Sequence, residues 1–506
     1  MSSAFQHPRS SIPASWGSSS SPSGFPAGRG ALLLVIASLA LSLLYCPPLD
    51  IFYDDIEIFR YFGRLIASGG VPYRDVFDHK PPLIFFFNTV GPWGIWLINT
   101  VLVLGASLLF LQLCRRVSLP WPWLPPLLFN LLIRNYLICF GVNMTRAYTA
   151  IFLLLFFCLL VGGNRRHRYY WLGLLTAATF FMQQDGIIVL SPLLLYALLT
   201  SRSLTDGLLA AAGFLTITTP LLVYFISHHA MTQLWQDAFQ FNFHWYLSKP
   251  TIGEHFRSTK QSLQNTDLQM PLILAAALGA CAWLGRHRKK GLLVAAFATL
   301  VLSFSAEILS GMLQYGYAFW YYLLPLSATL PILVFVAWAY TEEGWLRERK
   351  SQLLYGSLLC VMPLYDAGQH VTHLSTNNSY YVTDLPEYRY LRQHKPADRQ
   401  LYAFGDNNWV RAYNEFGIFS PCHWVYQHFW GWYPGWDPDG RQLKEMEADL
   451  QRYHTQYIIY NPRVNYFKDP AARTEWESFL NKFYQLQTVP GSTAPILWLR
   501  SSAPQE

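Results

Sequence analysis

Long apolar runs dominate the chain between about residues 30 and 365, whereas residues 366–506 mix polar and apolar positions as a water-soluble segment does. A helix needs roughly 20 apolar residues to cross a bilayer, and several runs approach that length. The pattern predicts a polytopic α-helical membrane protein with about eleven transmembrane helices. The runs cover approximately residues 31–46, 94–114, 121–140, 148–162, 170–182, 186–200, 207–227, 270–285, 291–309, 320–340 and 351–365.

The polar ends of the chain predict two further units. Residues 1–29 are rich in Ser, Pro and Gly without periodicity, which is typical of a disordered tail. In the C-terminal segment, short strand-like stretches near 402–404 and 456–460 alternate with helical patterns. These predict a small α/β domain over residues 366–506, after a membrane module over residues 30–365. The helical patterns lie near 385–394, 440–453 and 471–484.

Basic residues in the short loops predict the orientation of the membrane module. Lys and Arg follow the even-numbered runs, and Arg146 is the exception on the other side. By the positive-inside rule the N-terminus is cytoplasmic. The loops 47–93 and 228–269 and the C-terminal domain are then periplasmic, which predicts a multi-pass protein of a bacterial inner (plasma) membrane. The basic residues are Arg115, Arg116, Arg165, Arg166, Arg168, Arg202, Arg286, Arg288, Lys289, Lys290, Arg347, Arg349 and Lys350.

Composition narrows the class of protein. Of the 506 residues, 52% are hydrophobic and 13% are charged, and a soluble chain carries about twice that charge. Despite the net charge of +7, this excludes a disordered or nucleic-acid-coating protein. The seven cysteines show no CxxC or Cys/His ligand spacing, so neither a disulfide framework nor a structural zinc site is expected.

The first outside loop carries the densest ionisable cluster before the C-terminal segment. Apolar positions at helical spacing predict an amphipathic helix from Asp54 to Ala67, lying along the membrane surface. Gly69-Gly70 ends this helix, and Pro81-Pro82 favours an extended stretch before the next run. Ten ionisable residues fall within 27 positions: Asp54, Asp55, Glu57, Arg60, Arg64, Arg74, Asp75, Asp78, His79 and Lys80.

This cluster contains the residue types that sugar transfer from a lipid phosphate requires. Asp54 follows the first span, where partial desolvation and the neighbouring Asp55 raise a carboxyl pKa and make a better base. The Lys80 ammonium suits a phosphate as a point charge. An equally open interpretation is a solvated helix face whose charges only keep the loop in water.

The first loop also resembles a known family. Asp54-Asp55 and the run from Gly69-Gly70-Val71-Pro72-Tyr73-Arg74-Asp75 to Asp78-His79-Lys80-Pro81-Pro82 resemble the first periplasmic loop of GT-C fold glycosyltransferases. The likeness is nearest to bacterial lipopolysaccharide core sugar transferases of the rhizobial group. It is more distant to aminoarabinose transferases and protein O-mannosyltransferases. Weaker similarities follow at residues 183–186, 315–325 and 401–405.

The resemblance implies roles for individual residues. Asp54 would be the catalytic base, supported by Asp55, in a single inverting displacement, although the sequence leaves open which of the two is the base. Lys80 would bind the donor phosphate together with Arg60 and Arg74. No cofactor is required and no metal ligand set is assigned, although the acids offer ligands to a divalent ion. Further substrate-binding candidates are Glu57, Tyr73, Asp78, His79, Arg146, Gln184, Asp185 and Tyr321.

The expected function is therefore transfer of a sugar from a polyprenyl-phosphate donor to an extracytoplasmic glycan, lipid or protein acceptor. No Gly-rich nucleotide motif follows a strand in the C-terminal segment, which disfavours a nucleotide-sugar donor bound there. Two alternatives stay open. One is a transporter or flippase of lipid-linked sugars, which predicts paired charges at midplane depth and two similar halves. The other is a non-catalytic scaffold with the same fold.

Overall fold

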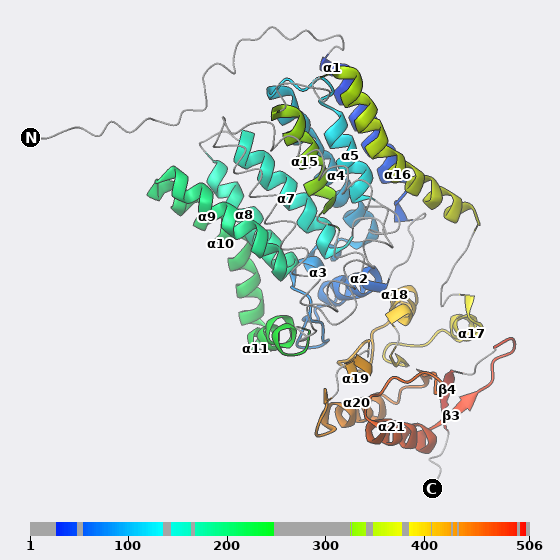
Figure 1. Cartoon of the computed structure of the whole chain (residues 1–506). Helices are drawn as coiled ribbons and strands as arrows, with labels where there is room; N and C mark the ends of the chain where they lie inside the picture. Colours follow the sequence, from blue (N-terminus) through cyan, green and yellow to red (C-terminus); the bar gives the residue numbers. More distant parts are fainter. Residues whose placement is uncertain are drawn as a thin grey trace, which may run out of the picture.

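The architecture was obtained as a computed structural model of the whole chain. A helical bundle occupies one end of the molecule and a small sheet with helices occupies the other, with α2 and α3 between them (Figure 1). The structure describes residues 27–47, 54–134, 143–162, 167–246, 324, 326–340, 348–376, 384–405, 407–426, 429–432, 435–492 and 496–501. The expected disordered tail and the runs at 270–285 and 291–309 lie mainly or wholly outside these residues.

The bundle contains four helical segments that are long and apolar enough to cross a membrane, counted over the described residues. They are α4 (Gly91–Arg116), α7 (Thr145–Gly162), the segment Gln184–Ser201 and α10 (Leu204–Ser227). The last two of these correspond to the predicted runs 186–200 and 207–227. The prediction of about eleven spans stays a prediction. α9 (Ile187–Ser201) makes up most of the third segment. Shorter or more polar helices complete the bundle: α1 (Ala27–Leu43), α5 (Leu124–Ile133), α8 (Arg168–Met182), α15 (Leu326–Tyr340) and α16 (Arg349–Thr376).

Two glycines allow α8 and α10 to pack closely. A Cβ built on Gly173 would collide with the backbone oxygen of Ala210, and one on Gly213 would collide with that of Tyr170. Small residues at such crossings let helix backbones approach within van der Waals contact in apolar surroundings. The sequence therefore encodes this crossing through residues that lack a side chain.

The described parts of loops 47–93 and 228–269, called the first and second outside loops after the side that the sequence predicts for them, form short helices at one end of the bundle. The predicted helix 54–67 is present as α2 (Asp54–Ala67), followed by α3 (Leu83–Asn88). Ile56, Phe59 and Tyr61 of α2 are fully buried because the helix packs against α3 and against α18 of the C-terminal domain. These residues of α2 are thus enclosed by protein, and the position of the helix along the membrane surface stays a prediction. The second loop contributes α11 (Met231–Gln233) and the π-helices η4 (Leu234–Gln240) and η5 (Asn242–Tyr246).

The C-terminal domain is a four-stranded sheet with helices. Its strand order is β1-β2-β4-β3, with β1 parallel to β2 and β4 antiparallel to both of its neighbours. The predicted strands correspond to β1 (Leu401–Ala403) and β2 (Tyr457–Ile459); β3 (Tyr484–Gln487) and β4 (Leu497–Arg500) were not predicted. The helices of this domain are α17 (Pro386–His394), α18 (Val410–Phe416), α19 (Phe429–Trp432), α20 (Arg441–Arg452) and α21 (Pro470–Phe483), and the short 3-10 helix η9 (Asn407–Trp409) precedes α18. A second 3-10 helix, η3 (Gln184–Gly186), lies in the bundle before α9.

Gly173→Ala is expected to destabilise the purified protein in detergent. The added methyl group would force α8 away from Ala210, and overpacking of this kind costs typically about 1–3 kcal/mol. The melting temperature should therefore fall. Gly207→Ala is the matched control, because nothing lies within 4 Å of a Cβ at that position. An equal loss in both variants would contradict the close packing at Gly173.

Candidate active site

The chain between α2 and α3 folds into a compact turn. Tyr73 has a left-handed backbone (φ 67°), and its N–H donates to the Val76 carbonyl at 2.8 Å. The Asp75 carboxylate accepts the Val71 N–H at 2.8 Å and two bonds from Arg74 at 2.7 and 2.9 Å. Arg74 also donates to the His228 carbonyl at 3.3 Å. The Pro-Tyr-Arg-Asp motif thus builds the turn, and Arg74 joins it to the end of α10.

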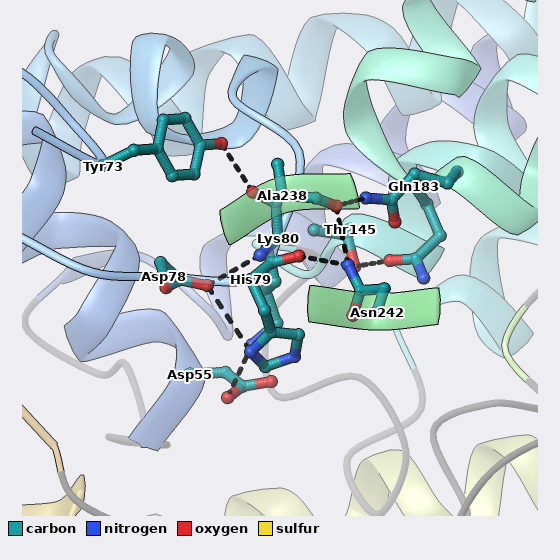
Figure 2. Close-up of polar contacts among 10 residues, drawn as sticks. Asp55, Tyr73, Asp78, His79, Lys80, Thr145, Gln183, Ala238 and Asn242 are labelled. Atoms are coloured by element: carbon teal, nitrogen blue, oxygen red, sulfur yellow. Dashed lines mark hydrogen bonds and ion pairs between the residues drawn. The ribbon is translucent and has the colours of Figure 1, made fainter. Parts of the chain in front are cut away.

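Lys80 is held at three places by residues of the same loop and of α2 (Figure 2). Its Nζ lies 3.0 Å from Oδ1 of Asp55, and the side chains of Lys80 and Asp55 are 15% and 14% exposed. Its carbonyl accepts the Tyr73 hydroxyl at 2.6 Å, and its N–H donates to Oδ1 of Asp78 at 2.8 Å. The ammonium also lies 4.9 Å from the centre of the Phe59 ring, at cation–π distance. The ion pair is therefore fixed in position and retains a small exposed surface.

Burial shifts the titration of the acids and of the imidazole around this pair. The Asp78 side chain is completely buried, which raises its pKa to about 6 although the Lys80 charge opposes the shift. Burial, and then the Asp78 charge, raise the pKa of Asp237 in η4 to about 8. Burial and then the Lys80 charge lower the pKa of His79 well below its usual range. At neutral pH the site therefore holds a protonated Asp237 and an uncharged imidazole.

The second outside loop connects this site to the bundle. The Asn242 amide donates to the carbonyl of His79 at 2.6 Å and to that of Ala238 at 2.7 Å. The Gln184 amide donates to the same Ala238 carbonyl. Figure 2 shows these bonds beside Lys80. The backbone next to Lys80 is thus hydrogen-bonded, through Asn242, to the beginning of a candidate membrane span.

Two further candidates, Arg146 and Asp185, form a buried ion pair. Nη2 of Arg146 lies 2.7 Å from Oδ2 of Asp185, with the guanidinium side chain 4% exposed and the acid 22% exposed. Beside this pair, the Thr145 hydroxyl donates to the Gln183 side chain at 2.7 Å. The two contacts join the N-terminus of α7 to the turn after α8. Arg146 therefore reaches an acid that the sequence places 39 residues later.

Glu57 faces the C-terminal domain and pairs with Arg60. Arg60 Nη1 lies 2.9 Å from Glu57 Oε1, and Glu57 also accepts from Asn414 at 2.7 Å. Their predicted roles toward donor phosphate and substrate stay predictions. The Asp54 side chain and Tyr321 lie outside the described residues. Within those residues no group of three or more His, Cys, Asp or Glu side chains is arranged to hold a metal ion.

Asp237 and Asn242 belong to the site but were not among the predicted residues. They lie more than 150 positions after Asp78 and His79 in the sequence. The only sequence signal was a single acid within an aromatic stretch of a long outside loop. Their recognition required the fold, because η4 and η5 pack beside the first loop only in three dimensions.

Solved structures show which fold this geometry belongs to. The chain resembles ArnT from Cupriavidus metallidurans bound to undecaprenyl phosphate, with a TM-score of 0.59 and 11% identity over 94% of this chain and 99% of that one. For ArnT from the same organism in the apo state, the TM-score is 0.60 and the sequence identity is 12%, over 95% of this chain and 100% of that one. An Archaeoglobus fulgidus oligosaccharyltransferase is more remote, with a TM-score of 0.41 and 10% identity over 93% of this chain and 74% of that one. No family model and no curated protein matches. The chain therefore has the GT-C fold.

Asp237→Asn is expected to make the protein more stable than the wild type at alkaline pH. A carboxyl whose pKa rises to about 8 on folding binds its proton more tightly in the folded state, so it stabilises at low pH. That contribution is lost as pH rises from about 4 to 8. The difference in melting temperature, variant minus wild type, should increase between pH 5 and pH 8.5. The exposed Asp439 provides the control Asp439→Asn; a pH-independent difference for Asp237→Asn would contradict the assignment.

Proposed function

We propose that the chain is a membrane glycosyltransferase that uses a polyprenyl-phosphate sugar donor. The observation that carries the proposal is the partly exposed Asp55–Lys80 ion pair, 3.0 Å long, on a GT-C fold. A carboxylate and an ammonium in contact supply the two groups that the reaction needs. The fold of ArnT, crystallised with undecaprenyl phosphate, supports a donor of the same class.

Arrival of the donor would redistribute the charges of the pair. Its phosphate competes with Asp55 for the Lys80 ammonium, because a phosphate is a strong acceptor for such a point charge. Transfer of Lys80 to the phosphate releases the Asp55 carboxylate. The ion pair therefore holds one carboxylate of the Asp54–Asp55 pair in a stable form and frees it, as base or as support for the base, when the leaving group is neutralised.

The chemical step is a single displacement at the anomeric carbon. A carboxylate of the Asp54–Asp55 pair takes the proton of the acceptor hydroxyl or amine as its oxygen or nitrogen bonds to that carbon. The bond from the carbon to the phosphate oxygen breaks, and its electrons leave with polyprenyl phosphate. Attack opposite the leaving group inverts the anomeric centre, as one base does in inverting glycosidases. Asp54, the first residue of α2, is the base that the family resemblance favours.

We also propose that the site lies on the extracytoplasmic side of the membrane. The alternation of Lys and Arg between short loops supports a cytoplasmic N-terminus, about eleven spans, and a periplasmic C-terminal domain in the inner membrane. Lipid-phosphate sugars are the donors suited to that side, where nucleotide sugars are scarce. The acceptor is an extracytoplasmic glycan, lipid or protein, with cell-envelope lipopolysaccharide as the candidate that the sequence resemblance favours.

Asp54→Asn is expected to lower kcat for sugar transfer by roughly 10²–10⁴-fold, the usual contribution of a general base. The donor KM should change little, because the phosphate contact is kept. Release of polyprenyl phosphate measures turnover and separates an enzyme from a flippase or a scaffold. Asp55→Asn, measured in parallel, shows which carboxylate dominates. Wild-type turnover in both folded variants would overturn the base assignment.

Lys80→Ala is expected to weaken donor binding about 10–100-fold, the equivalent of a charged hydrogen bond of roughly 1.5–3 kcal/mol. Direct binding of polyprenyl phosphate to the purified protein measures this. Lys80→Arg keeps the charge and should retain part of the affinity. Lys482→Ala, on the exposed side of α21, is the matched control. Unchanged affinity in Lys80→Ala would contradict the phosphate contact.

A further inference from the structure

A short segment of the C-terminal domain, residues 413–424, contacts both stretches of chain that carry the Asp55–Lys80 pair. We call it the brace segment. It begins in α18 and continues toward the aromatic stretch before α19. On one side it bonds to α2, which carries Asp55, and on the other to the loop that carries Lys80.

The contact with α2 is polar and specific. Asn414 Nδ2 donates to the Glu57 carbonyl at 2.8 Å and to Glu57 Oε2 at 2.7 Å. Arg64 of α2 donates to the Tyr413 carbonyl at 2.7 Å, to Asn414 Oδ1 at 3.1 Å and to the Ile418 carbonyl at 3.3 Å. The amide of Asn414 is thus used at both ends, as a donor to Glu57 and as an acceptor from Arg64. Glu57 lies two residues after Asp55.

Aromatic packing strengthens the same contact. The Tyr61 hydroxyl accepts the Ser420 N–H at 3.0 Å, and the Tyr61 ring meets those of Tyr413 and Phe419 edge-on at 5.8 and 5.6 Å. The Arg64 guanidinium lies 5.0 Å from the centre of the Phe419 ring. Tyr61 is fully buried, so α2 cannot shift along the brace segment without losing these contacts.

The contact with the Lys80 loop is made through Phe77. The Phe77 N–H donates to the His423 carbonyl at 2.9 Å, and its ring lies 4.6 Å from the Trp424 ring. Phe241 of the second outside loop packs on the same Phe77 ring at 5.3 Å. Phe77 is 3% exposed and precedes Lys80 by three residues. The position of the loop backbone is therefore set by the C-terminal domain as well as by the bundle.

We propose that the brace segment sets the geometry of the Asp55–Lys80 pair, with Asn414 as its principal positioning residue. The inference rests on the proposed function and deepens it, because it makes the C-terminal domain a necessary part of a site carried by the membrane module. A residue misplaced by about 1 Å can cost about 10²-fold in rate. A segment that holds both partners of the pair controls that displacement directly.

The chemistry of Asn414 explains why an amide is needed there. Asp at this position would keep the acceptor for Arg64 but would lose the donor and place a second carboxylate beside Glu57. Leu has the same branched shape, with larger terminal groups, and neither the donor nor the acceptor. Asn414→Leu therefore removes the polar bonds while keeping the branching of the side chain, which leaves the Glu57 carbonyl and carboxylate with fewer donors.

The test compares wild type, Asn414→Leu, Lys80→Ala and the double variant. Asn414→Leu is expected to lower kcat about tenfold or more, with a smaller change in the donor KM. In the Lys80→Ala background the same substitution should cost much less, because the pair that it positions is already gone; such coupling identifies residues that act through one another. Asn481→Leu, on the exposed face of α21, is the control and should leave kcat unchanged.

Hydrogen exchange of residues 54–82 provides a readout that does not depend on activity. Asn414→Leu should accelerate exchange in this stretch, and Asn481→Leu should not. If wild type releases no polyprenyl phosphate, the proposed function fails while exchange still tests the brace. If wild type is active and Asn414→Leu leaves kcat unchanged, or lowers it by the same factor with and without Lys80, the positioning role is overturned. Should Asn414→Leu not fold, Asn414→Ala and Arg64→Lys are measured by the same criteria.

Discussion

The ion pair between Asp55 and Lys80 is the contact around which the outer part of the molecule is organised. The Lys80 side chain is only 15% exposed, and burying a charged group is costly unless a counter-charge lies within contact. Asp55 provides that charge from α2. Tyr73 donates to the backbone carbonyl of Lys80, and Asp78 accepts its backbone N–H. The turn at Tyr73 and the docking of α2 both serve to keep these atoms together.

The acids around the pair show how the site limits its own negative charge. Asp55 and Asp78 face one lysine, and a donor phosphate would add further negative charge. A third carboxylate would increase that repulsion, but burial and the Asp78 charge keep the proton on Asp237 at neutral pH. Arg74 contributes little free positive charge, since its Nε and Nη2 both bond to the Asp75 carboxylate. Lys80 is thus the principal cation offered to an incoming anion by the described part of the loop.

Three stretches of chain that are distant in sequence meet at this site: the first outside loop, the second outside loop and the brace segment. Phe77 contacts the other two, through Phe241 on one side and through His423 and Trp424 on the other. His423 and Trp424, at the beginning of an aromatic stretch, pack against the loop that carries Lys80. The C-terminal domain is in this way joined to the loop that carries Lys80.

The sequence by itself determined the features that depend on local pattern. The spacing of apolar residues and the flanking glycines were sufficient to predict the helix from Asp54 to Ala67. The motif around Lys80 was sufficient to suggest a candidate site and its chemistry. Strands β3 and β4 escaped prediction although each is one residue longer than β1 and β2. β3 begins directly where α21 ends, so no turn residue separates the two elements in the sequence.

Only the tertiary structure decided which charges are paired and which acids keep their protons. Asp55 meets Lys80 across 25 positions and Glu57 meets Asn414 across 357, while the pKa of Asp237 depends on burial beside Asp78. Secondary structure follows largely from neighbours along the chain. Desolvation and ion pairing depend on every atom within a few ångströms, whatever its position in the sequence.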